Sequence, residues 1–387
     1  MNTIGILGAG KLGLCLALSL EDAGFDVLSY DINIDILDKI QNKTLESNEP
    51  YVMNMLKKSK NLNVTKNITD VLQRPIIFIV VNTPSKNDGA YDHSAIDSIV
   101  NDMETYYSNN PNTNTKYVVI VSTVMPKYCD SIQTKLSSYN IDIIYNPEFI
   151  AQGSIIKDTL NPDMILIGSN SIKGGNIIEN IHMKLVRNMP TICKMSCLEA
   201  EITKISLNCF LTTKIAFGNC IGDLAVSQNC NPNTILNAIG SDTRIGKKYL
   251  KYGFGYGGPC LPRDNRAYNY FSRQQNMNNL IGEASDNLNT IHSEFLYNKI
   301  KKILDTENKS VLFNQLTYKK NTCLIEESKQ FELANLLANS GYNVYAQEIE
   351  SVKEYINSKF PDHKIIFINS IDNLVNYLTI DDLIQIT

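Results

Sequence analysis

The sequence predicts an α/β protein in which two doubly wound domains flank a long central helix and a helical middle domain. Three observations support this prediction. Short apolar runs alternate with helical patterns from residue 3 to 187, an uninterrupted helical pattern follows, and a second alternation of strands and helices ends the chain. We expect a dinucleotide-binding domain at 1–196, a central helical domain at 197–300 and a second α/β domain at 301–387.

The N-terminal residues carry a dinucleotide-binding pattern. A strand over 3–7 leads into Gly8-x-Gly10-x-x-Gly13, a helix and a second strand that ends in Asp31. The glycines admit a pyrophosphate, which the helix N-terminus then binds. Asp31 should accept hydrogen bonds from the adenosine ribose and repel a 2′-phosphate. This Rossmann-like unit predicts NAD(H) or FAD binding, with NAD favoured over NADP, through Gly8, Gly10, Lys11, Leu12, Gly13 and Asp31.

Four further apolar runs predict buried strands of one parallel sheet, at residues 76–81, 117–121, 141–145 and 164–168. Ligands bind at the carboxyl ends of the strands in such sheets. Thr83, Thr123 and Glu148 each follow one of these strands, so we expect them at the ligand edge. Each residue alone is more often a helix cap or turn residue, but their common edge favours a binding role.

The helical pattern over 198–228 would be about 45 Å long if continuous. Its apolar residues cover more of its surface than one small domain needs, so we expect it to bridge domains and to pack against a second subunit. Glu201, Lys204 and Asn208 share one face. The alternative for these three is a solvated polar stripe, which the apolar neighbours of Asn208 do not favour.

The loop over 253–264 is the candidate active site. Four glycines crowd Cys260, and Pro262 suits the first turn of a helix. A cysteine at such a junction lies near the positive end of the helix dipole, which favours the reactive thiolate. Asp264 follows one turn along on the same face. The alternative is a tight turn with a buried structural cysteine.

The last segment predicts a small α/β domain without a second GxGxxG pattern. Its expected elements are a strand at 310–313, a helix at 331–339, a strand at 343–345, a further helix, a strand at 365–368 and a short end strand near 383–386.

The composition also indicates which partners, cross-links and locations to expect. The net charge of −4 favours neither nucleic acid nor an anionic membrane as a partner. Nine scattered cysteines without a CxxC pair argue against a disulfide framework and a zinc site, so no metal is expected. The sequence has no signal-peptide pattern and no apolar run of membrane-spanning length. We therefore expect a cytoplasmic protein.

Together these motifs resemble the nucleotide-sugar dehydrogenase family over nearly the whole chain. The resemblance implies NAD in the N-terminal domain, a UDP-sugar in the C-terminal domain and a homodimer through the long helix. It favours UDP-glucose as substrate and UDP-glucuronate, a polysaccharide precursor, as product. The motifs that carry it occur in the family's order: the glycine-rich turn, Asn82-Thr83-Pro84, Ser122-Thr123, Asn146-Pro147-Glu148-Phe149, Glu201-x-x-Lys204-x-x-x-Asn208, Arg244-Ile245-Gly246 and Gly255-Tyr256-Gly257-Gly258-x-Cys260-Leu261-Pro262-x-Asp264.

The resemblance also implies roles for individual residues. Oxidising an alcohol to an acid takes two steps, and a nucleophilic Cys260 would hold the aldehyde between them as a thiohemiacetal. Lys204 would stabilise an oxyanion beside Asn208. Asp264 would hold water, with Thr123, and Glu148 would assist hydrolysis. Expected cofactor contacts are the turn residues with Thr83, Thr123, Glu148 and Arg263, and expected substrate contacts are Glu148, Phe149, Lys204, Asn208, Arg244, Tyr249, Gly257 and Lys319.

One departure from the family bears on cofactor binding. Glu326 stands where the family has an arginine, so we expect closure on the cofactor to be weaker or to use Lys320. Other readings stay open. They are a dehydrogenase for GDP-mannose or a UDP-N-acetylhexosamine, a one-step β-hydroxyacid dehydrogenase that has no use for Cys260, and an inactive binding homologue.

Overall fold

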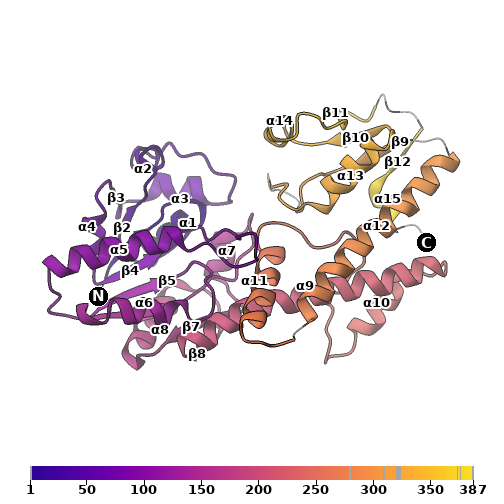
Figure 1. Ribbon diagram of the computed structural model, residues 1–387. Coiled ribbons are helices and arrows are strands. Elements are labelled where there is room, and N and C mark those ends of the chain that lie inside the picture. The colour runs from indigo at the N-terminus through magenta and orange to yellow at the C-terminus, as the bar shows by residue number, and fades with distance from the viewer. Residues whose placement is uncertain are drawn as a thin grey trace. The chain divides into compact units, whose positions relative to one another are not determined.

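The computed structural model describes residues 2–278, 280–307, 310–319, 324–372, 374 and 376–385 (Figure 1). The chain divides into two compact units, Met1–Lys204 and Ile205–Thr387. Each unit is an α/β assembly with its own sheet. The finer division into three domains stays a prediction.

The N-terminal unit is built on an eight-stranded sheet in the order β3-β2-β1-β4-β5-β6-β7-β8. The chain order reverses between β1 and β4, which is the switch point where doubly wound sheets bind ligands. The strands are β1 (Thr3–Leu7), β2 (Asp26–Tyr30), β3 (Leu62–Thr65), β4 (Ile76–Ile79), β5 (Lys116–Ile120), β6 (Ile141–Tyr145), β7 (Met164–Ser169) and β8 (Thr191–Met195).

The direction of β7 corrects the prediction of a wholly parallel sheet. β7 pairs antiparallel to β6, with Ile144 opposite Ser169 and Tyr145 opposite Gly168, and β8 then runs parallel to β7. A buried apolar strand has the same pattern in either direction, so the sequence contained no signal for this reversal. The two edge strands, β3 and β8, were not predicted because they are less apolar and more exposed than the central strands.

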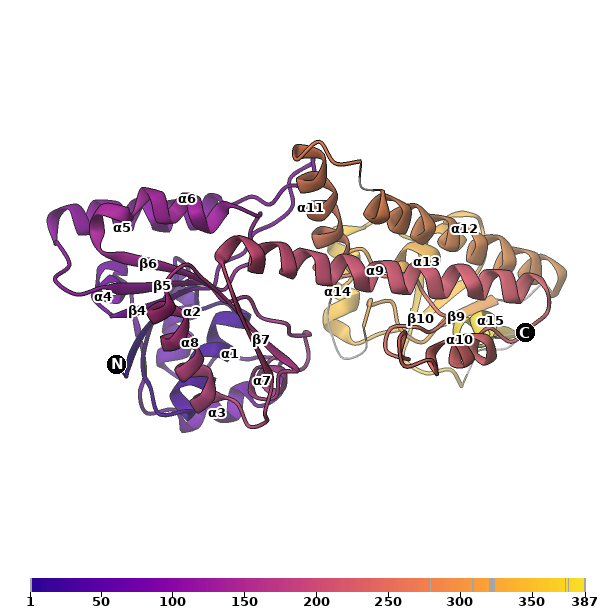
Figure 2. The same ribbon diagram turned by 90° about the horizontal axis from the view of Figure 1, so that it is seen from below.

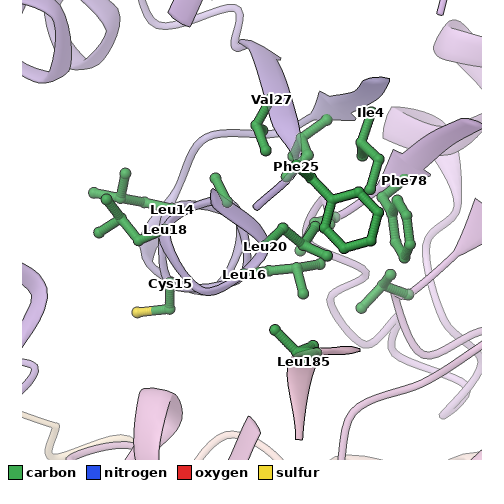
Figure 3. Close-up of a cluster of buried hydrophobic side chains, with 14 of the residues drawn as sticks. Ile4, Leu14, Cys15, Leu16, Leu18, Leu20, Phe25, Val27, Phe78 and Leu185 are labelled. Atoms are coloured by element: carbon green, nitrogen blue, oxygen red, sulfur yellow. The ribbon is translucent and has the colours of Figure 1, made fainter. Parts of the chain in front are cut away.

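Helices cover both faces of this sheet. Helix α1 is buried on all sides, since every residue from Gly13 to Leu20 is buried. Its leucines belong to one buried cluster with Phe25, Val27 and Phe78, and Leu16 and Leu20 lie on the side of the two phenylalanines (Figure 3). This apolar packing fixes the turn that precedes α1. The helices are α1 (Lys11–Asp22), α2 (Ile34–Gln41), α3 (Val52–Lys58), α4 (Ile68–Leu72), α5 (Ser94–Asn109), α6 (Tyr128–Lys135), α7 (Ile155–Leu160) and α8 (Ile172–Leu185), with a 3₁₀ turn at Ser137–Tyr139.

The C-terminal unit has a four-stranded parallel sheet in the order β11-β10-β9-β12. Helix α9 (Cys197–Ser227) is continuous and begins before the unit boundary, and α12 runs beside its C-terminal part (Figure 2). The other elements are α10 (Pro232–Gly240), α11 (Leu261–Gln274), α12 (Ile281–Glu307), β9 (Ser310–Phe313), α13 (Lys329–Asn339), β10 (Val344–Gln347), α14 (Glu350–Lys359), β11 (Ile366–Ile368), β12 (Tyr377–Thr379) and α15 (Ile380–Gln385).

The predicted end strand near 383–386 is wrong within the described residues, because Ile380–Gln385 form helix α15; residue 386 lies outside them. Ile380, Leu383 and Ile384 are buried and spaced i, i+3 and i+4, which is the helical period. The Thr379 hydroxyl accepts a hydrogen bond from the Asp382 N–H at 3.2 Å, which caps the helix. The strand lies just before it, at β12.

Among the described helices, α9 is the one that is long and apolar enough to suit a membrane span by length and composition. Core helices of folded proteins meet the same criterion. Helix α9 also carries Glu201 and Lys204, and both side chains are buried against protein partners. This burial fits a helix inside a protein fold.

Candidate active site

The glycine-rich turn combines two glycines required by packing with one that faces open space. At Gly8, which has φ +103°, a Cβ would lie 2.2 Å from the carbonyl oxygen of Val80, and at Gly13 it would lie 1.8 Å from the carbonyl oxygen of Gly8. At Gly10, no protein atom lies within 4 Å of an added Cβ. The turn therefore closes tightly on the sheet and leaves room in front of Gly10.

The open space lies at the start of α1. Gly10 is the N-cap residue, no side chain caps the helix, and its first turn has no acidic residue. The first N–H groups are thus available to an anion. Asp31 accepts hydrogen bonds from the N–H groups of Ala9 at 2.7 Å and Asn33 at 2.9 Å, which leaves capacity for further donors. This arrangement fits a dinucleotide. Lys11 is exposed and Leu12 half-buried in the first turn of α1.

The loops after β4 and β5 are tied to each other. The Thr83 hydroxyl donates to the carbonyl oxygen of Thr123 at 2.7 Å. The Ser122 hydroxyl accepts from the N–H of Val81 at 2.9 Å and donates to its carbonyl oxygen at 2.7 Å. Thr83 is buried, whereas Thr123 is half-buried. Thr83 thus holds the edge together, and Thr123 lies beside it as predicted.

Asn146 fixes the loop after β6. Its amide donates to the carbonyl oxygen of Leu166 at 2.9 Å, and its oxygen accepts from Nε2 of His182 at 2.7 Å. Burial lowers the pKa of His182 to about 4, so the ring is neutral. Farther along, the Glu49 carboxylate accepts from the N–H of Gly153 at 2.7 Å. No local pattern in the sequence indicates these roles of His182 and Glu49, because each lies far from its partner in the chain.

Glu148, Phe149 and Lys204 come together, as predicted for one site. The Lys204 ammonium donates to the backbone carbonyl of Glu148 at 2.7 Å and lies 4.3 Å from the centre of the Phe149 ring. Burial raises the pKa of the Glu148 carboxyl to about 7, although the charge of Lys204 lowers it. Near neutral pH this carboxyl can therefore either take or give a proton.

Glu201 is fully buried and caps helix α6. Its two carboxylate oxygens accept from the N–H groups of Lys127 at 2.7 Å and Cys129 at 2.8 Å. Burial raises the pKa of Glu201 to about 7, and these hydrogen bonds lower it. Lys204 and Asn208 are also buried, with 7% and 9% of their surface exposed. The alternative of a solvated polar stripe is therefore wrong.

In the C-terminal unit, Cys260 lies at the N-terminus of α11. It is the N-cap residue of that helix and is exposed, so the alternative of a buried structural cysteine is wrong. Asp264 lies one turn along and is fully buried. Its carboxylate accepts from the Asn208 amide at 2.6 Å and pairs with Nε of Arg263 at 2.8 Å. Asn208 and Asp264 thus form a buried pair, and the half-buried Arg263 borders it.

Protein neighbours account for three of the four glycines of the cysteine loop. An added Cβ would lie 2.1 Å from Oδ1 of Asn289 at Gly255, 2.1 Å from the carbonyl oxygen of Glu327 at Gly257, and 2.7 Å from the Tyr318 ring at Gly258. Protein atoms therefore fill the space at these three positions. At the fourth, Gly253, no atom lies within 4 Å of the added Cβ.

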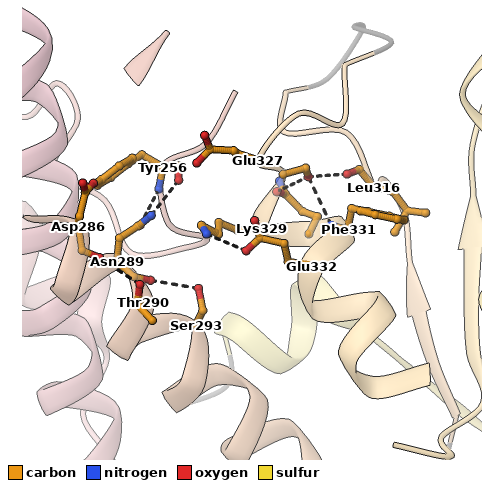
Figure 4. A network of polar contacts seen from close by, with 12 residues as sticks. Tyr256, Asp286, Asn289, Thr290, Ser293, Leu316, Glu327, Lys329, Phe331 and Glu332 are labelled. Atoms are coloured by element: carbon orange, nitrogen blue, oxygen red, sulfur yellow. Dashed lines mark hydrogen bonds and ion pairs between the residues drawn. The ribbon is translucent and has the colours of Figure 1, made fainter. Parts of the chain in front are cut away.

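Side chains of α12 hold the middle of this loop (Figure 4). Asn289 accepts from the N–H of Tyr256 and donates to its carbonyl oxygen, each at 3.0 Å. The Tyr256 hydroxyl donates to Asp286. The Arg266 guanidinium makes two bonds of 2.7 Å to the carboxylate of Glu327.

The remaining predicted substrate residues lie elsewhere in the C-terminal unit. Arg244 is exposed and pairs with Asp242 at 2.7 Å. Tyr249 is half exposed at φ +62°. Lys319 follows β9, and its carbonyl oxygen accepts from the Thr317 hydroxyl at 3.1 Å. These contacts leave the predicted roles untested.

Glu326, the residue that departs from the family pattern, lies within the described residues. The Glu326 side chain is exposed, and its carbonyl oxygen accepts from the N–H of Gly258 at 3.0 Å. Lys320, the suggested substitute, lies outside the described residues. Within the part of the chain that the structure describes, no group of three or more His, Cys, Asp or Glu side chains could hold a metal ion.

The fold and these motifs define an NAD-dependent nucleotide-sugar dehydrogenase, and comparison with known proteins agrees. The NAD-binding domain of the UDP-glucose/GDP-mannose dehydrogenase family matches residues 2–186, and the central domain of that family matches residues 198–290. The chain therefore belongs to this family and binds NAD.

Named relatives act on more than one sugar. The UDP-glucose 6-dehydrogenase of Rickettsia felis is 28% identical over 95% of this chain and 83% of its own length. The GDP-mannose 6-dehydrogenase of Pseudomonas aeruginosa is 27% identical over 96% of this chain and 88% of its own. A UDP-glucose dehydrogenase structure from Pyrobaculum islandicum has a TM-score of 0.86 at 24% identity, covering 98% of this chain and 89% of that one. The fold and class are thus established without fixing the sugar.

The glycine-rich turn allows a matched pair of substitutions. Gly13→Ala would force a methyl group against the Gly8 carbonyl, so we expect it to lower the free energy of unfolding by about 2–4 kcal/mol. Gly10→Ala meets no protein atom, so its stability should stay within about 1 kcal/mol of wild type. It should nevertheless weaken NAD binding about tenfold or more, because the methyl group takes the space of the cofactor.

Thermal unfolding and NAD titration by calorimetry measure both effects. A Gly10→Ala protein that binds NAD as tightly as wild type would show that the open space in front of α1 is not the pyrophosphate site.

Proposed function

We propose that the protein oxidises the 6-hydroxymethyl group of UDP-glucose to the carboxylate of UDP-glucuronate, as a UDP-glucose 6-dehydrogenase does. The observation that carries the proposal is the exposed Cys260 at the N-terminus of α11, with the buried Asn208–Asp264 pair one turn below. A one-step dehydrogenase has no need of this nucleophile. The form of the cysteine loop and the Rickettsia relative favour UDP-glucose.

The proposed reaction balances over two oxidations. NAD, when bound, accepts one hydride in each oxidation, so two molecules are reduced per sugar. The alcohol first loses a hydride and a proton to give the aldehyde. The Cys260 sulfur then adds to the aldehyde carbon and forms a thiohemiacetal, whose oxidation gives a thioester. Water cleaves the carbon–sulfur bond, which releases the acid and restores the thiol.

The side chains that act with Cys260 in the proposed mechanism supply hydrogen-bond donors and a general base. The Lys204 ammonium would stabilise the oxyanion, with the Asn208 amide as a second donor. Glu148, with its pKa near 7, would take a proton from the water that attacks the thioester. Asp264 and Thr123 would orient that water. The proposal requires both units to act on one substrate.

The remaining contacts are proposed from the resemblance. Thr83 and Arg263 would line the cofactor site, although each is already tied to a neighbour in the protein. Phe149, Arg244, Tyr249, Gly257 and Lys319 would contact the nucleotide sugar. The exposed Glu326 would repel a pyrophosphate, which favours weaker closure on the cofactor.

We also propose a cytoplasmic homodimer that forms through α9. Phe210, Phe217 and Leu224 are spaced seven residues apart, and 64%, 45% and 62% of their surfaces are exposed. Such a spacing places them along one side of the helix. A row of large apolar side chains on a long helix favours pairing with a second copy.

The first test counts NADH per sugar. With limiting UDP-glucose, wild type should form two NADH per molecule, measured by absorbance, and Cys260→Ala should lose at least about 10³-fold of its net oxidation rate. One NADH per sugar, or an active Cys260→Ala protein, would indicate a one-step dehydrogenase. Activity with GDP-mannose or a UDP-N-acetylhexosamine but not with UDP-glucose would keep the mechanism and change the sugar.

The raised pKa of Glu148 predicts the pH dependence of hydrolysis. The carboxylate form increases as pH rises through about 7, so the rate of thioester hydrolysis should rise through the same range. Glu148→Gln should lose this rise and about 10²-fold or more of kcat. Single-turnover kinetics on the acylated Cys260 isolate this step. An unchanged pH profile in Glu148→Gln would exclude Glu148 as the base.

The same shift predicts a stability effect of the opposite sign. The folded protein holds the Glu148 proton up to about pH 7, whereas the unfolded chain releases it near 4.5. The folded state therefore binds more protons in this interval, and stability falls as pH rises through it. Denaturant unfolding at a series of pH values measures this effect. Glu148→Gln should reduce the fall in the free energy of unfolding between about pH 4.5 and 7, and the part that remains would come from Glu201, whose pKa is also raised to about 7.

The dimer is tested by Phe217→Asp, which places a charge in the middle of the proposed interface. We expect light scattering to give the monomer mass for this variant and the dimer mass for wild type. Leu336→Asp, at a residue with 48% exposure on α13, is the control and should stay dimeric. A monomeric wild type would rule out the proposed assembly.

A further inference from the structure

His292 is a buried histidine that the proposed mechanism does not use. It lies on α12 with 1% of its surface exposed. Its Nε2 is 2.6 Å from the carbonyl oxygen of Gly253, the first residue of the cysteine loop. Its Nδ1 is 2.8 Å from Oδ2 and 3.0 Å from Oδ1 of Asp223 on α9. The histidine thus joins two helices to the entry of the loop.

Hydrogen-bond chemistry fixes the number of protons in this group. A carbonyl oxygen can only accept, so Nε2 of His292 must carry a hydrogen. Nδ1 faces the Asp223 carboxyl group, and an ionised carboxylate also only accepts, so a second proton must lie between them. The pair therefore holds one proton more than a neutral imidazole and an ionised carboxylate together.

Tyr252 and Lys299 are the other titratable groups around the pair. The Tyr252 hydroxyl donates to Asp223 at 2.9 Å, and its ring meets the His292 ring edge-on at 5.6 Å. Burial and Asp223 raise the pKa of Tyr252. Burial lowers the pKa of Lys299, whereas the charge of Asp223 raises it. Gly222 makes room for the tyrosine, because an added Cβ would lie 2.0 Å from its ring.

A second contact of the same kind lies one turn away on α12. Asn289 holds both backbone groups of Tyr256, and His292 holds the carbonyl of Gly253 (Figure 4 shows the first). Asn289 precedes His292 by three residues on α12, whereas its partner Tyr256 follows Gly253 by three residues in the loop. The loop therefore runs antiparallel to the helix. Asn219 accepts from the N–H of Gly253 at 3.1 Å. Buried side chains therefore hold both polar groups of Gly253.

We propose that His292 and Asp223 are positioning residues that hold the entry of the cysteine loop through their shared proton. Without it, only one ring nitrogen would carry a hydrogen, and the other would face an acceptor oxygen of either Gly253 or Asp223 at hydrogen-bond distance, where two acceptors repel each other. Cys260 lies in this loop, so the conformation of the loop sets the position of the thiol. The effect of the pair on the turnover rate rests on the proposed function, whereas its effect on the conformation of the loop does not.

Three variants separate the shared proton from the contact with the loop. In Asp223→Asn, a neutral His292 keeps both bonds, because Nδ1 can accept from the new amide. In His292→Gln, the amide can donate to Gly253, but its oxygen faces the carboxylate. The double variant lets the two amides bond to each other. Thr290→Ala is the matched control on α12, because its hydroxyl donates within the helix to Asp286.

Hydrogen exchange of the 253–258 amides, corrected for the chemical exchange rate, reads the loop directly. Wild type should be protected about threefold to tenfold more than His292→Gln. Asp223→Asn and the double variant should be protected as well as wild type. Equal protection in wild type and His292→Gln, or equal loosening in Thr290→Ala, would overturn the proposal.

Turnover then separates this proposal from the proposed function. With UDP-glucose, His292→Gln should lower kcat about threefold to tenfold and leave the KM for NAD unchanged. Adding Asp223→Asn to this variant should restore kcat. If no nucleotide sugar is oxidised but the exchange pattern is as expected, the positioning pair stands and the proposed reaction fails. If wild type is active and the exchange pattern is absent, the positioning pair fails alone.

Discussion

The buried carboxylate of Asp264 is the constraint on which the C-terminal site depends. A charge without exposed surface is stable only when its oxygens accept hydrogen bonds or meet a cation. Asn208 on α9 and Arg263 on α11 meet this need, so the two helices are fixed at one relative position. Because Cys260 begins the same helix one turn earlier, the burial of Asp264 also sets where the exposed thiol lies.

Acidic side chains perform a related task in both sheets. Asp31 follows β2 and accepts from the N–H of Ala9 in the turn after β1. Glu348 follows β10 and accepts from the N–H groups of Leu316 and Thr317 in the loop after β9. In each unit, the acid after the second strand thus orders the loop after the first. The C-terminal unit repeats this device without the glycines that open the N-terminal turn to a pyrophosphate.

The sequence was sufficient where a feature depends on neighbours in the chain. The glycine-rich turn and the position of Cys260 at a helix start followed from local motifs, whereas the grouping of Glu148 with Lys204, which lie 56 residues apart, followed from the family resemblance. The direction of β7, the cap that Glu201 gives α6 and the contact of His292 with Gly253 did not, because each depends on a partner more than about 20 residues away. Helix α15 is different, since its i, i+3, i+4 spacing was present and a short apolar run was read as a strand.

The glycines of the cysteine loop give a reason why Glu326 leaves the fold intact. Gly257 and Gly258 pack against the backbone of Glu327 and the ring of Tyr318, and the N–H of Gly258 donates to the carbonyl of Glu326. The loop therefore uses only the main chain of residue 326, and the exposed side chain takes no part in that bond. An exchange of the family's arginine for glutamate can change the charge offered to a ligand, while the packing that positions Cys260 depends on glycines that tolerate no Cβ.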